Sequence, residues 1–413
     1  MKSFHYKIII PILLLLSIIL ILSCSTQQSV QLSITNPTNL SLADVFITAD
    51  IDSSIKSFSA YEDEKLIPSQ LLISDGKKEI GFVLNLNPFE NKKILIKPDN
   101  EKHEFKSRTY AELAMKPGDI YIDGKFRGDK FVNVLNLKVS VIHTDHDALF
   151  KYEGPGWESE LVGYRFYLDW RNANDIFGKK VNKLLLSEIG VHDTVGKDDS
   201  YHQMQNWGMD IFKVGNSLGI GSIGMMYDNK VIMVSKTDSI YCEITDNGPL
   251  VSSVKTNYFG WLVGKNKYHL TSTLSISAGS RLTKCQLEIS GNPDNLVTGL
   301  AKYEGTDFVR NNSNSDWAYI SLYGNQSLSG PDDKLGIAVF YKRDAFLELT
   351  EDELSYIVKL KPENGGVEYY FFAAWEHEPN GIKNRNDFIK YLDDILEQLN
   401  NPPVVKNEGS GNQ

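Results

Sequence analysis

Apolar residues recur at every second position along most of the chain, and this period is typical of β-strands with one buried face. From Ile80 to Leu86 the even-numbered positions are all apolar, and Gly76 and Pro88 bound the run. The same alternation occurs on both sides of an Asn-Pro-Thr-Asn turn at residues 36–39. We therefore predict a small β-sandwich over residues 30–105.

Strand patterns continue through the second part of the chain, with short breaks at Gly, Asn and Asp. Leu270, Leu274 and Ile276 alternate before a turn at residues 278–281, and the alternation then resumes up to Ile289. This hairpin resembles those of galactose-mutarotase-like β-supersandwiches. We predict such a domain, including a terminal helix, over residues 130–400. Residues 106–129 are rich in turn residues and are predicted to be a linker.

One segment near the end has the periodicity of a helix. Its apolar residues form an i, i+4, i+7, i+8 stripe between Phe388 and Leu399, and Asp387 lies at the N-terminal end, where negative charge is favoured. Pro402 follows, and residues 401–413 are predicted to be a disordered tail. The predicted fold class is thus mainly β, with a large sandwich, a smaller N-terminal sandwich and one C-terminal helix.

The N-terminus has the pattern of a targeting segment. Lys2 and Lys7 precede an apolar run, Ile8 to Ser23, which is short for a membrane-spanning helix. Its ending, Ile-Leu-Ser-Cys24, resembles a bacterial lipobox. We predict a signal peptide over residues 1–23, lipidation of Cys24 and a polar tether over residues 24–29. An uncleaved anchor helix is the alternative. Acidic residues do not follow Cys24 directly, which favours the periplasmic side of the outer membrane over the cell surface.

Charge narrows the class of partner. The chain has 43 basic and 53 acidic residues, and removal of Lys2 and Lys7 would give 41 − 53 = −12. This acidic balance argues against nucleic acid, which requires a basic face. A local group of Arg and Lys could still bind an anionic small ligand. Cys242 and Cys285 lie in phase with apolar neighbours, so they are either buried thiols or a disulfide.

The side chains with the most chemical potential lie between residues 141 and 222. A strand starting at Tyr164 would direct Tyr164, Phe166, Leu168 and Trp170 to the core, and the alternate residues to the other face. That other face would carry Arg165, Tyr167, Asp169 and Arg171. Arg binds a planar carboxylate with two parallel hydrogen bonds. The face therefore indicates a carboxylate site, or alternatively a solvated surface with two Arg–Asp pairs.

Other candidates surround this strand. His143 and His146 have the spacing of a metal pair, but the sequence identifies no third ligand, so we predict no cofactor and consider both as general acids or bases. His202 is a third imidazole. Candidate substrate-binding residues are an aromatic pair, an acid and a cation: Trp157, Trp207, Glu158 and Lys213.

Several long motifs resemble one family. They are Tyr-Glu-Gly-Pro-Gly-Trp-Glu-Ser from Tyr152, Tyr-Arg-Phe-Tyr-Leu-Asp-Trp-Arg-Asn from Tyr164, Asp-Ile-Phe-Gly-Lys from Asp175, Ser-Tyr-His from Ser200, Trp-Gly-Met-Asp-Ile-Phe-Lys-Val-Gly from Trp207 and Tyr-Tyr-Phe-Phe-Ala-Ala-Trp-Glu from Tyr369. The family was long catalogued as a domain of unknown function. It occurs in bacterial polysaccharide utilisation and includes an ulvan oligosaccharide dehydratase. The resemblance implies removal of water from a non-reducing-end uronic acid.

The candidate site residues suit that chemistry. Loss of the C5 proton of a uronate requires a cation at the carboxylate, a base at C5 and an acid for the leaving C4 hydroxyl. Arg165 and Arg171 would neutralise the carboxylate. His143 or His146 would be the base, and Tyr167 or His202 the acid. The alternatives are a polysaccharide lyase or hydrolase of the same pathway, or a non-catalytic glycan-binding lipoprotein.

Overall fold

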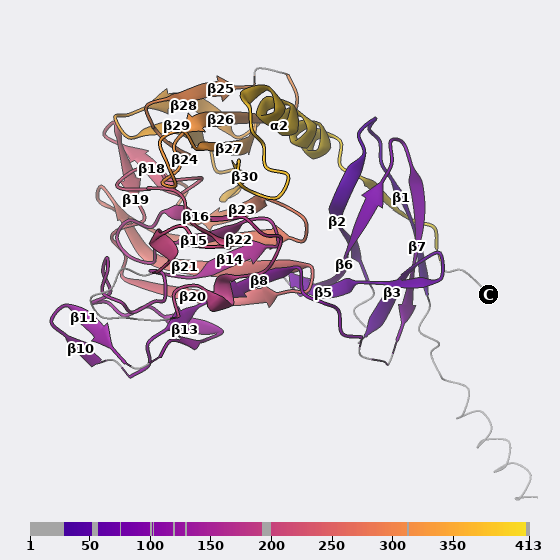
Figure 1. The fold of residues 1–413 in the computed structure, drawn as a ribbon, viewed down its shortest axis with the longest axis horizontal. Helices are drawn as coiled ribbons and strands as arrows, with labels where there is room; N and C mark the ends of the chain where they lie inside the picture. Colours follow the sequence, from indigo (N-terminus) through magenta and orange to yellow (C-terminus); the bar gives the residue numbers. More distant parts are fainter. Residues whose placement is uncertain are drawn as a thin grey trace, which may run out of the picture.

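The computed structural model describes residues 29–51, 57–74, 76–99, 101, 103–118, 120–128, 130–191, 200–311 and 314–409. The predicted signal peptide and Cys24 lie outside these residues. Figure 1 shows two β-rich bodies side by side, a small one formed by the N-terminal part of the chain and a large one formed by the rest. No helix within the described ranges has the length and apolar character needed to cross a bilayer.

The small body is a two-sheet sandwich, as the alternation predicted. One sheet has the order β31-β1-β7-β3-β4 and the other β2-β6-β5. Ile34, Phe82 and Ile94 are fully buried between them. The strands are β1 (Val30–Thr35), β2 (Leu42–Asp50), β3 (Phe58–Glu62), β4 (Lys65–Ile67), β5 (Ser69–Ser74), β6 (Lys77–Leu86), β7 (Asn91–Pro98) and β31 (Val404–Asn407).

Strand β31 corrects the prediction of a disordered tail over residues 401–413. The chain returns from the large body to the small one, as Figure 1 shows, and β31 pairs with β1 in antiparallel register, Ile34 opposite Val405. Val405 packs against the core of the sandwich. The polar composition of this segment concealed a short edge strand whose backbone hydrogen bonds are supplied by a partner far away in sequence.

The predicted linker, residues 106–129, is also part of the fold. It contains β8 (Thr109–Glu112), β9 (Ala114–Met115), β10 (Ile120–Ile122) and β11 (Lys125–Arg127). Strand β8 is the edge strand of a five-stranded sheet in the large body, where Ala111 lies opposite Trp157. The large body therefore begins before residue 130, because turn residues in this region separate very short strands.

The large body is built around a nine-stranded sheet of order β13-β20-β21-β22-β23-β30-β27-β26-β25. Its members are β13 (Asn136–Lys138), β20 (Ser239–Asn247), β21 (Val251–Val263), β22 (Asn266–Ser277), β23 (Leu282–Ile289), β25 (Thr306–Arg310), β26 (Trp317–Asn325), β27 (Lys334–Lys342) and β30 (Gly366–Trp375). The hairpin predicted around residues 278–281 joins β22 to β23, with Leu274 opposite Cys285.

Two five-stranded sheets accompany it, of order β17-β16-β15-β14-β8 and β19-β18-β24-β29-β28. Their remaining strands are β14 (Gly156–Ser159), β15 (Gly163–Phe166), β16 (Asn174–Lys179), β17 (Gly208–Asp210), β18 (Gly224–Tyr227), β19 (Lys230–Met233), β24 (Leu296–Ala301), β28 (Phe346–Glu351) and β29 (Ser355–Leu360), with the two-residue β12 (Val132–Asn133) beside β9.

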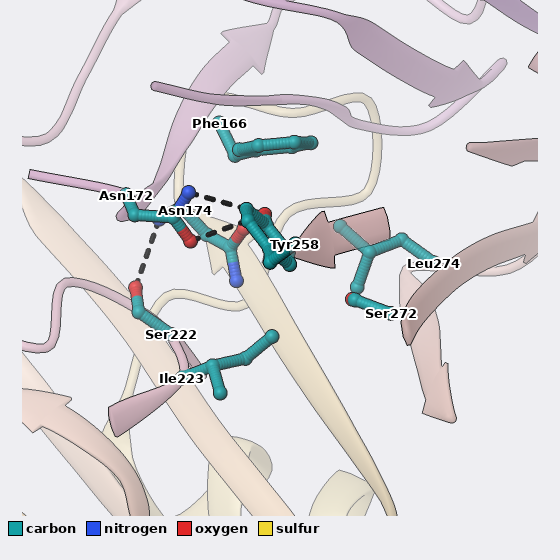
Figure 2. A pocket seen from close by; sticks show the side chains of 8 residues that line it. All are labelled: Phe166, Asn172, Asn174, Ser222, Ile223, Tyr258, Ser272 and Leu274. Carbon is teal, nitrogen blue, oxygen red and sulfur yellow. Dashed lines mark hydrogen bonds between the residues drawn. The ribbon is translucent and has the colours of Figure 1, made fainter. Parts of the chain in front are cut away.

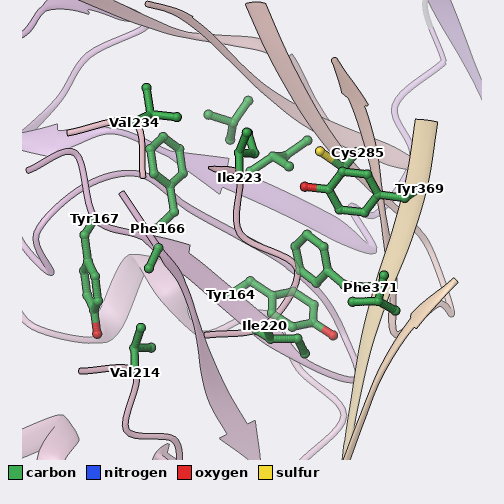
Figure 3. Packing of buried hydrophobic residues seen from close by; sticks show 14 of the residues in the cluster. Tyr164, Phe166, Tyr167, Val214, Ile220, Ile223, Val234, Cys285, Tyr369 and Phe371 are labelled. Atoms are coloured by element: carbon green, nitrogen blue, oxygen red, sulfur yellow. The ribbon is translucent and has the colours of Figure 1, made fainter. Parts of the chain in front are cut away.

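Aromatic residues join the first of these sheets to the nine-stranded sheet. Tyr164 of β15 meets Phe371 of β30 edge to face at 5.4 Å, and Trp157 of β14 meets the same ring. Figure 3 shows Tyr164, Phe166 and Phe371 in this core. The buried face of β15 is thereby fixed, and its other face is left for polar groups. The mainly β class is confirmed.

The predicted helix is α2 (Arg385–Asn400), and the side chain of Asn384 accepts a hydrogen bond from the Asp387 amide at its start. Phe388 and Leu392 are fully buried against β26, β27 and β30. Two short 3-10 helices, η1 (Leu186–Glu188) and η2 (Ser200–His202), complete the described elements. Cys242 and Cys285 are buried free thiols, the first of the two alternatives.

Candidate active site

The polar face of β15 forms the centre of the candidate site. Arg165 lies opposite Asp175 of the neighbouring strand β16, and paired residues of adjacent strands point to the same face. The predicted division holds for Tyr164 and Phe166 in the core and for Arg165 and Tyr167 on the other face. Leu168 is also buried in the core, and the division fails at Trp170, because β15 ends at Phe166.

Beyond that point the chain turns. The Asn172 amide donates to the Asp169 carbonyl at 3.1 Å, and Trp170, predicted to face the core, is 47% exposed. Asp169 and Arg171 therefore join the polar group by way of a turn and not by strand alternation. Side chains alternate between two faces only within a strand, and this strand has four residues.

Arg165 is buried among carboxylates. Its Nη2 donates to Asp175 Oδ2 at 2.7 Å and to Asp210 Oδ2 at 2.6 Å. Its side chain is only 3% exposed. Because two protein carboxylates already satisfy the guanidinium, Arg165 positions other groups, and the predicted role of a carboxylate clamp for substrate does not fit it.

Two phenols complete this buried group. Arg165 Nη1 donates to the Tyr201 hydroxyl at 3.2 Å, and the Tyr167 hydroxyl donates to Asp175. Burial, which outweighs the opposing charge of Arg165, raises the pKa of Tyr167 well above its ordinary value. Tyr167 is therefore a protonated hydrogen-bond donor at neutral pH, and at 5% exposure it acts from behind the surface.

Arg171 forms a second group nearer to solvent. Its Nε donates to Asp169 Oδ1 at 3.0 Å and its Nη2 donates to Glu153 Oε1 at 2.9 Å. Nη2 also lies 2.7 Å from Asp145, and the guanidinium stacks on the Tyr167 ring at 3.9 Å. Tyr167 thus links the two arginine groups. The Arg171 side chain is 11% exposed.

The three predicted histidines have different surroundings. His143 is buried, its Nδ1 lies 2.8 Å from Asp147, and its ring packs on Phe150. This burial excludes it from contact with a substrate and contradicts its predicted catalytic role. The metal pair also fails, because His146 contacts different carboxylates, Asp145 and Glu153.

His146 and His202 both face solvent at this site. His146 is 76% exposed, and its Nδ1 is 3.5 Å from Glu153. His202 is 46% exposed, and its Nδ1 is 3.3 Å from Asp210, the carboxylate that also accepts from Arg165. Each imidazole is oriented by a carboxylate on one nitrogen, which is the arrangement that prepares a histidine for proton transfer.

The carboxylates differ in how readily they hold a proton. Burial and the neighbouring charge of Asp210 raise the pKa of Asp175 to about 6. Burial would also raise the pKa of Glu153, but the charges of Arg165 and Arg171 outweigh it and lower that pKa to about 2. A site with perturbed carboxyl groups of both kinds is typical of acid–base chemistry.

Charge balance is the feature that sequence analysis did not anticipate. The two arginines face five carboxylates, those of Asp145, Glu153, Asp169, Asp175 and Asp210. Sequence analysis assigned a site role only to Asp169 among them. Asp175 lies in a quoted motif as the β16 partner of Arg165, so strand pairing could have indicated it. Asp210 is 45 positions from Arg165, and no local pattern connects them.

Two predicted substrate-binding residues play other roles. Trp157 is fully buried and donates to Thr283, so it belongs to the core. Glu158 is fully buried, pairs with Lys179 and accepts the Leu185 amide at 2.7 Å, which makes it a structural residue. Both assignments to substrate binding are wrong.

Trp207 and Lys213 are nearer to the surface. Trp207 is half-buried and meets Phe177 edge to face at 6.3 Å, beside the buried arginine group, since Arg165 stacks on the same Phe177 ring at 5.2 Å. Lys213 is exposed, and only its carbonyl contacts a described side chain, that of Tyr303. The structure brings Trp207 to the site but shows no contact of the Lys213 ammonium with it.

A small cavity lies behind the site. Phe166, Asn172, Asn174 and Tyr258 are among the residues that line it, as Figure 2 shows, and its volume is about 10 Å³. Such a volume holds about one water molecule. The cavity is therefore too small for a ligand larger than water.

Sequence and structure similarities relate the chain to known proteins. The model of a family described as Domain of unknown function (DUF4861) matches residues 34–405. The chain belongs to this family. An uncharacterized protein of Formosa agariphila, similar to this DUF4861 chain, is 24% identical over 216 residues, which are 51% of the chain and 52% of the relative. The chain thus spans about half the length of the curated relative it matches.

Two solved structures resemble this DUF4861 protein distantly. One is a glycosyl hydrolase family 38 protein from Enterococcus faecalis, with 9% identity, a TM-score of 0.46, and coverage of 93% of this chain and 48% of that chain. The other is an alpha-mannosidase from Enterococcus faecalis V583, with 8% identity, a TM-score of 0.47, and coverage of 93% and 46%.

Proposed function

We propose that this DUF4861 protein is a carbon–oxygen lyase that removes water from the non-reducing-end uronic acid of an ulvan-type oligosaccharide. The product would be a 4,5-unsaturated uronate. The observation that carries the proposal is the pair of solvent-facing imidazoles, His146 and His202, each oriented by a carboxylate of one connected Arg–Tyr–carboxylate group. The resemblance of the quoted motifs to a family with an ulvan oligosaccharide dehydratase supports the substrate.

In the proposed reaction, His146 accepts the C5 proton, and the C5–H electron pair forms the C4=C5 double bond. The C4–O bond breaks, and the leaving hydroxide takes a proton from His202 and departs as water. Arg171 is the more exposed arginine, and it would bind the substrate carboxylate by exchanging Asp145 or Glu153 for it. Arg165 and Tyr167 hold Asp175 and Asp210 in place behind the reacting groups.

Because carboxylates outnumber arginines at the site, the proposed reaction requires part of this negative charge to be neutralised. An anionic sugar approaches favourably only when part of the site is protonated. Protonation of Asp175 would supply this, and its pKa of about 6 places the change below neutral pH. We therefore expect turnover to be higher on the acidic side of neutrality than on the alkaline side.

Incubation of the purified protein with saturated, uronate-ended oligosaccharides, followed by mass spectrometry, tests the reaction. We expect each oligosaccharide to lose the mass of one water without shortening, and ultraviolet absorbance to rise because the new double bond conjugates with the carboxylate. Shortened products would replace this proposal with a polysaccharide lyase or hydrolase. Sugar that binds but stays unchanged would indicate a non-catalytic glycan-binding lipoprotein.

We propose in addition that Cys24 is lipidated and places the protein in the cell envelope, on the periplasmic side of the outer membrane. The apolar run that ends at Ser23-Cys24 supports this. Cys24→Ala should move the protein from the detergent phase to the aqueous phase on partitioning. Equal partitioning of the two forms would show that the anchor is of another kind.

The hairpin of β22 and β23, around the turn at residues 278–281, supports a further proposal about the fold. We propose that the large body is a galactose-mutarotase-like supersandwich, because its longest strands form one broad antiparallel sheet backed by smaller sheets.

A further inference from the structure

A second group of metal-ligating side chains lies where β27 and β30 meet, independently of the proposed lyase reaction. These strands are antiparallel neighbours, with Leu335 opposite Trp375. Extension of that register places Asp333 beside His377, just outside the paired residues. The Lys334 carbonyl accepts the Glu376 amide at 3.1 Å, so the two chains stay together up to this point.

The two oxygens of Asp333 have different surroundings. Oδ2 accepts a hydrogen bond from Trp375 Nε1 at 2.6 Å and another from the Ser329 hydroxyl. Oδ1 is buried and accepts no hydrogen bond from any described residue. The residue is only 6% exposed. A buried carboxylate oxygen without a donor is costly, and a cation is the group that would compensate it.

His377 approaches the same oxygen. His377 Nε2 lies 3.2 Å from Asp333 Oδ1, although the ring is not oriented to donate to it. One ligand atom from each of Asp333, Glu376 and His377 lies within 4.8 Å of the others. A tetrahedral zinc site with bonds of about 2.0–2.1 Å separates its ligands by about 3.3 Å, close to the distance observed.

Neighbouring charges do not neutralise these carboxylates. Among the described residues, neither Asp333 nor Glu376 forms an ion pair with a lysine or arginine. The nearby Glu378 does so, with Arg281 Nε at 2.7 Å, and the Lys334 ammonium is turned to Asn325. Two carboxylates close together repel one another, so a protonated His377 or a bound metal ion would stabilise this pair.

We propose that Asp333, Glu376 and His377 bind one divalent transition-metal ion of the zinc class. A nitrogen ligand combined with two carboxylates favours Zn²⁺ over Ca²⁺, which prefers oxygen ligands alone. His377 is 50% exposed, so a fourth position is open to water.

The site has a structural consequence for the candidate active site. Asp333 ends the loop that begins at Gln326, and in that loop the Leu328 amide donates to the Ile211 carbonyl at 2.8 Å. Ile211 directly follows Asp210, which orients His202. The ion would therefore fasten β30 to the loop that supports the Asp210 segment.

Calorimetric titration of the EDTA-treated protein with ZnCl₂, with parallel melting curves, tests the proposal. His377→Ala and Glu376→Gln remove ligands; the glutamine keeps an acceptor for the Lys334 amide, which now donates to Glu376 at 2.7 Å. Each variant should weaken binding at this site at least tenfold. Zinc at 100 times its Kd should raise the wild-type melting temperature by on the order of 5 °C, and should raise that of the variants much less.

His146→Ala is the matched control, since His146 with Asp145 and Glu153 is the other group of potential ligands. It should leave the zinc-dependent rise in melting temperature intact. Circular dichroism of each metal-free variant verifies that it is folded. Wild-type protein that binds no zinc, variants that bind it equally well, or loss of binding in His146→Ala in place of His377→Ala would each overturn the proposal.

Discussion

His202 and His269 are alike as exposed imidazoles that pack on an aromatic neighbour, and among the described residues only His202 forms an ion pair with a carboxylate. The ring centroids are 4.3 Å apart for Tyr201 and His202, and 4.5 Å for Phe259 and His269. His202 also contacts Asp210. This difference allows a matched test of the proposed acid.

His202→Gln should lower turnover about 10²–10⁴-fold, because it removes a group that exchanges protons. The melting temperature should change little, since an exposed His contributes about 0–1 kcal/mol through its ion pair. His269→Gln should change neither quantity. Rates and melting curves of the three proteins decide the matter, and a His202→Gln enzyme with full turnover would remove this residue from the mechanism.

Asp175 makes stability depend on pH. Its folded pKa of about 6 lies above the ordinary pKa of an aspartate, so the folded state keeps a proton that the unfolded state releases. The stabilising contribution is therefore fully present below about pH 4 and is lost as the pH rises through about 6. In Asp175→Asn no carboxyl group titrates at this position, so this stability is not lost as the pH rises.

We accordingly expect the melting temperature of Asp175→Asn, relative to wild type, to be more favourable at pH 7 than at pH 4.5. Melting curves of both proteins at several pH values between these limits measure it. A difference that stays constant across this range would show that Asp175 does not carry the raised pKa.

Sequence analysis could reach individual residues of the site only where a local period applied. Arg165 and Tyr167 were placed on one face because they lie two positions apart, and Tyr167 directly follows the end of β15. Asp210 and Glu153 escaped, because a partner 45 positions away or a turn at the end of a strand has no period. Trp157 and Glu158 were misassigned because the local sequence does not reveal whether an aromatic side chain or an ion pair is buried or exposed.

At the level of elements, length decided what the sequence could predict. The sixteen residues of α2 contain enough turns for an apolar stripe, and β6 contains enough residues for alternation. Strands such as β9 and β11 have two or three residues and no detectable period, so their region resembled a linker. Strand β31 was missed for the same reason.

Strand β31 provides a test at this scale. It covers the edge of β1, and deletion of residues 404–413 would leave β1 with β7 as its only partner in the sheet. The loss of paired backbone groups and of Val405 packing should destabilise the small body by roughly 2–4 kcal/mol. Hydrogen exchange of β1 amides should accelerate at least tenfold.

The control is a chain that ends after residue 409, which keeps the whole of β31. Its exchange should match that of the full chain. Unchanged protection of β1 in the shorter chain would mean that the sandwich does not depend on its C-terminal strand.

On the scale of the whole molecule, the two bodies are joined by more than the connecting chain. Arg108 donates to Asp44 of the small body at 2.7 Å and to Glu160 of the large one at 2.7 Å. Gln70 of β5 reaches into the large body and is only 8% exposed. Such joints between distant segments follow from tertiary packing, and the hydrophobic pattern that defined each body does not contain them.

Gln70 is the sharper test of this joint. Its Oε1 accepts the Leu250 and Val251 amides at 2.8 and 2.9 Å, and its Nε2 donates to the Val251 carbonyl at 3.1 Å. Gln70→Ala leaves these buried groups without partners, so the free energy of unfolding should fall by roughly 2–4 kcal/mol. Gln286→Ala, an exposed position on β23, should cost about 0.5 kcal/mol or less. Urea unfolding followed by tryptophan fluorescence measures both, and equal midpoints for the two variants would show that the bodies are held together by other contacts.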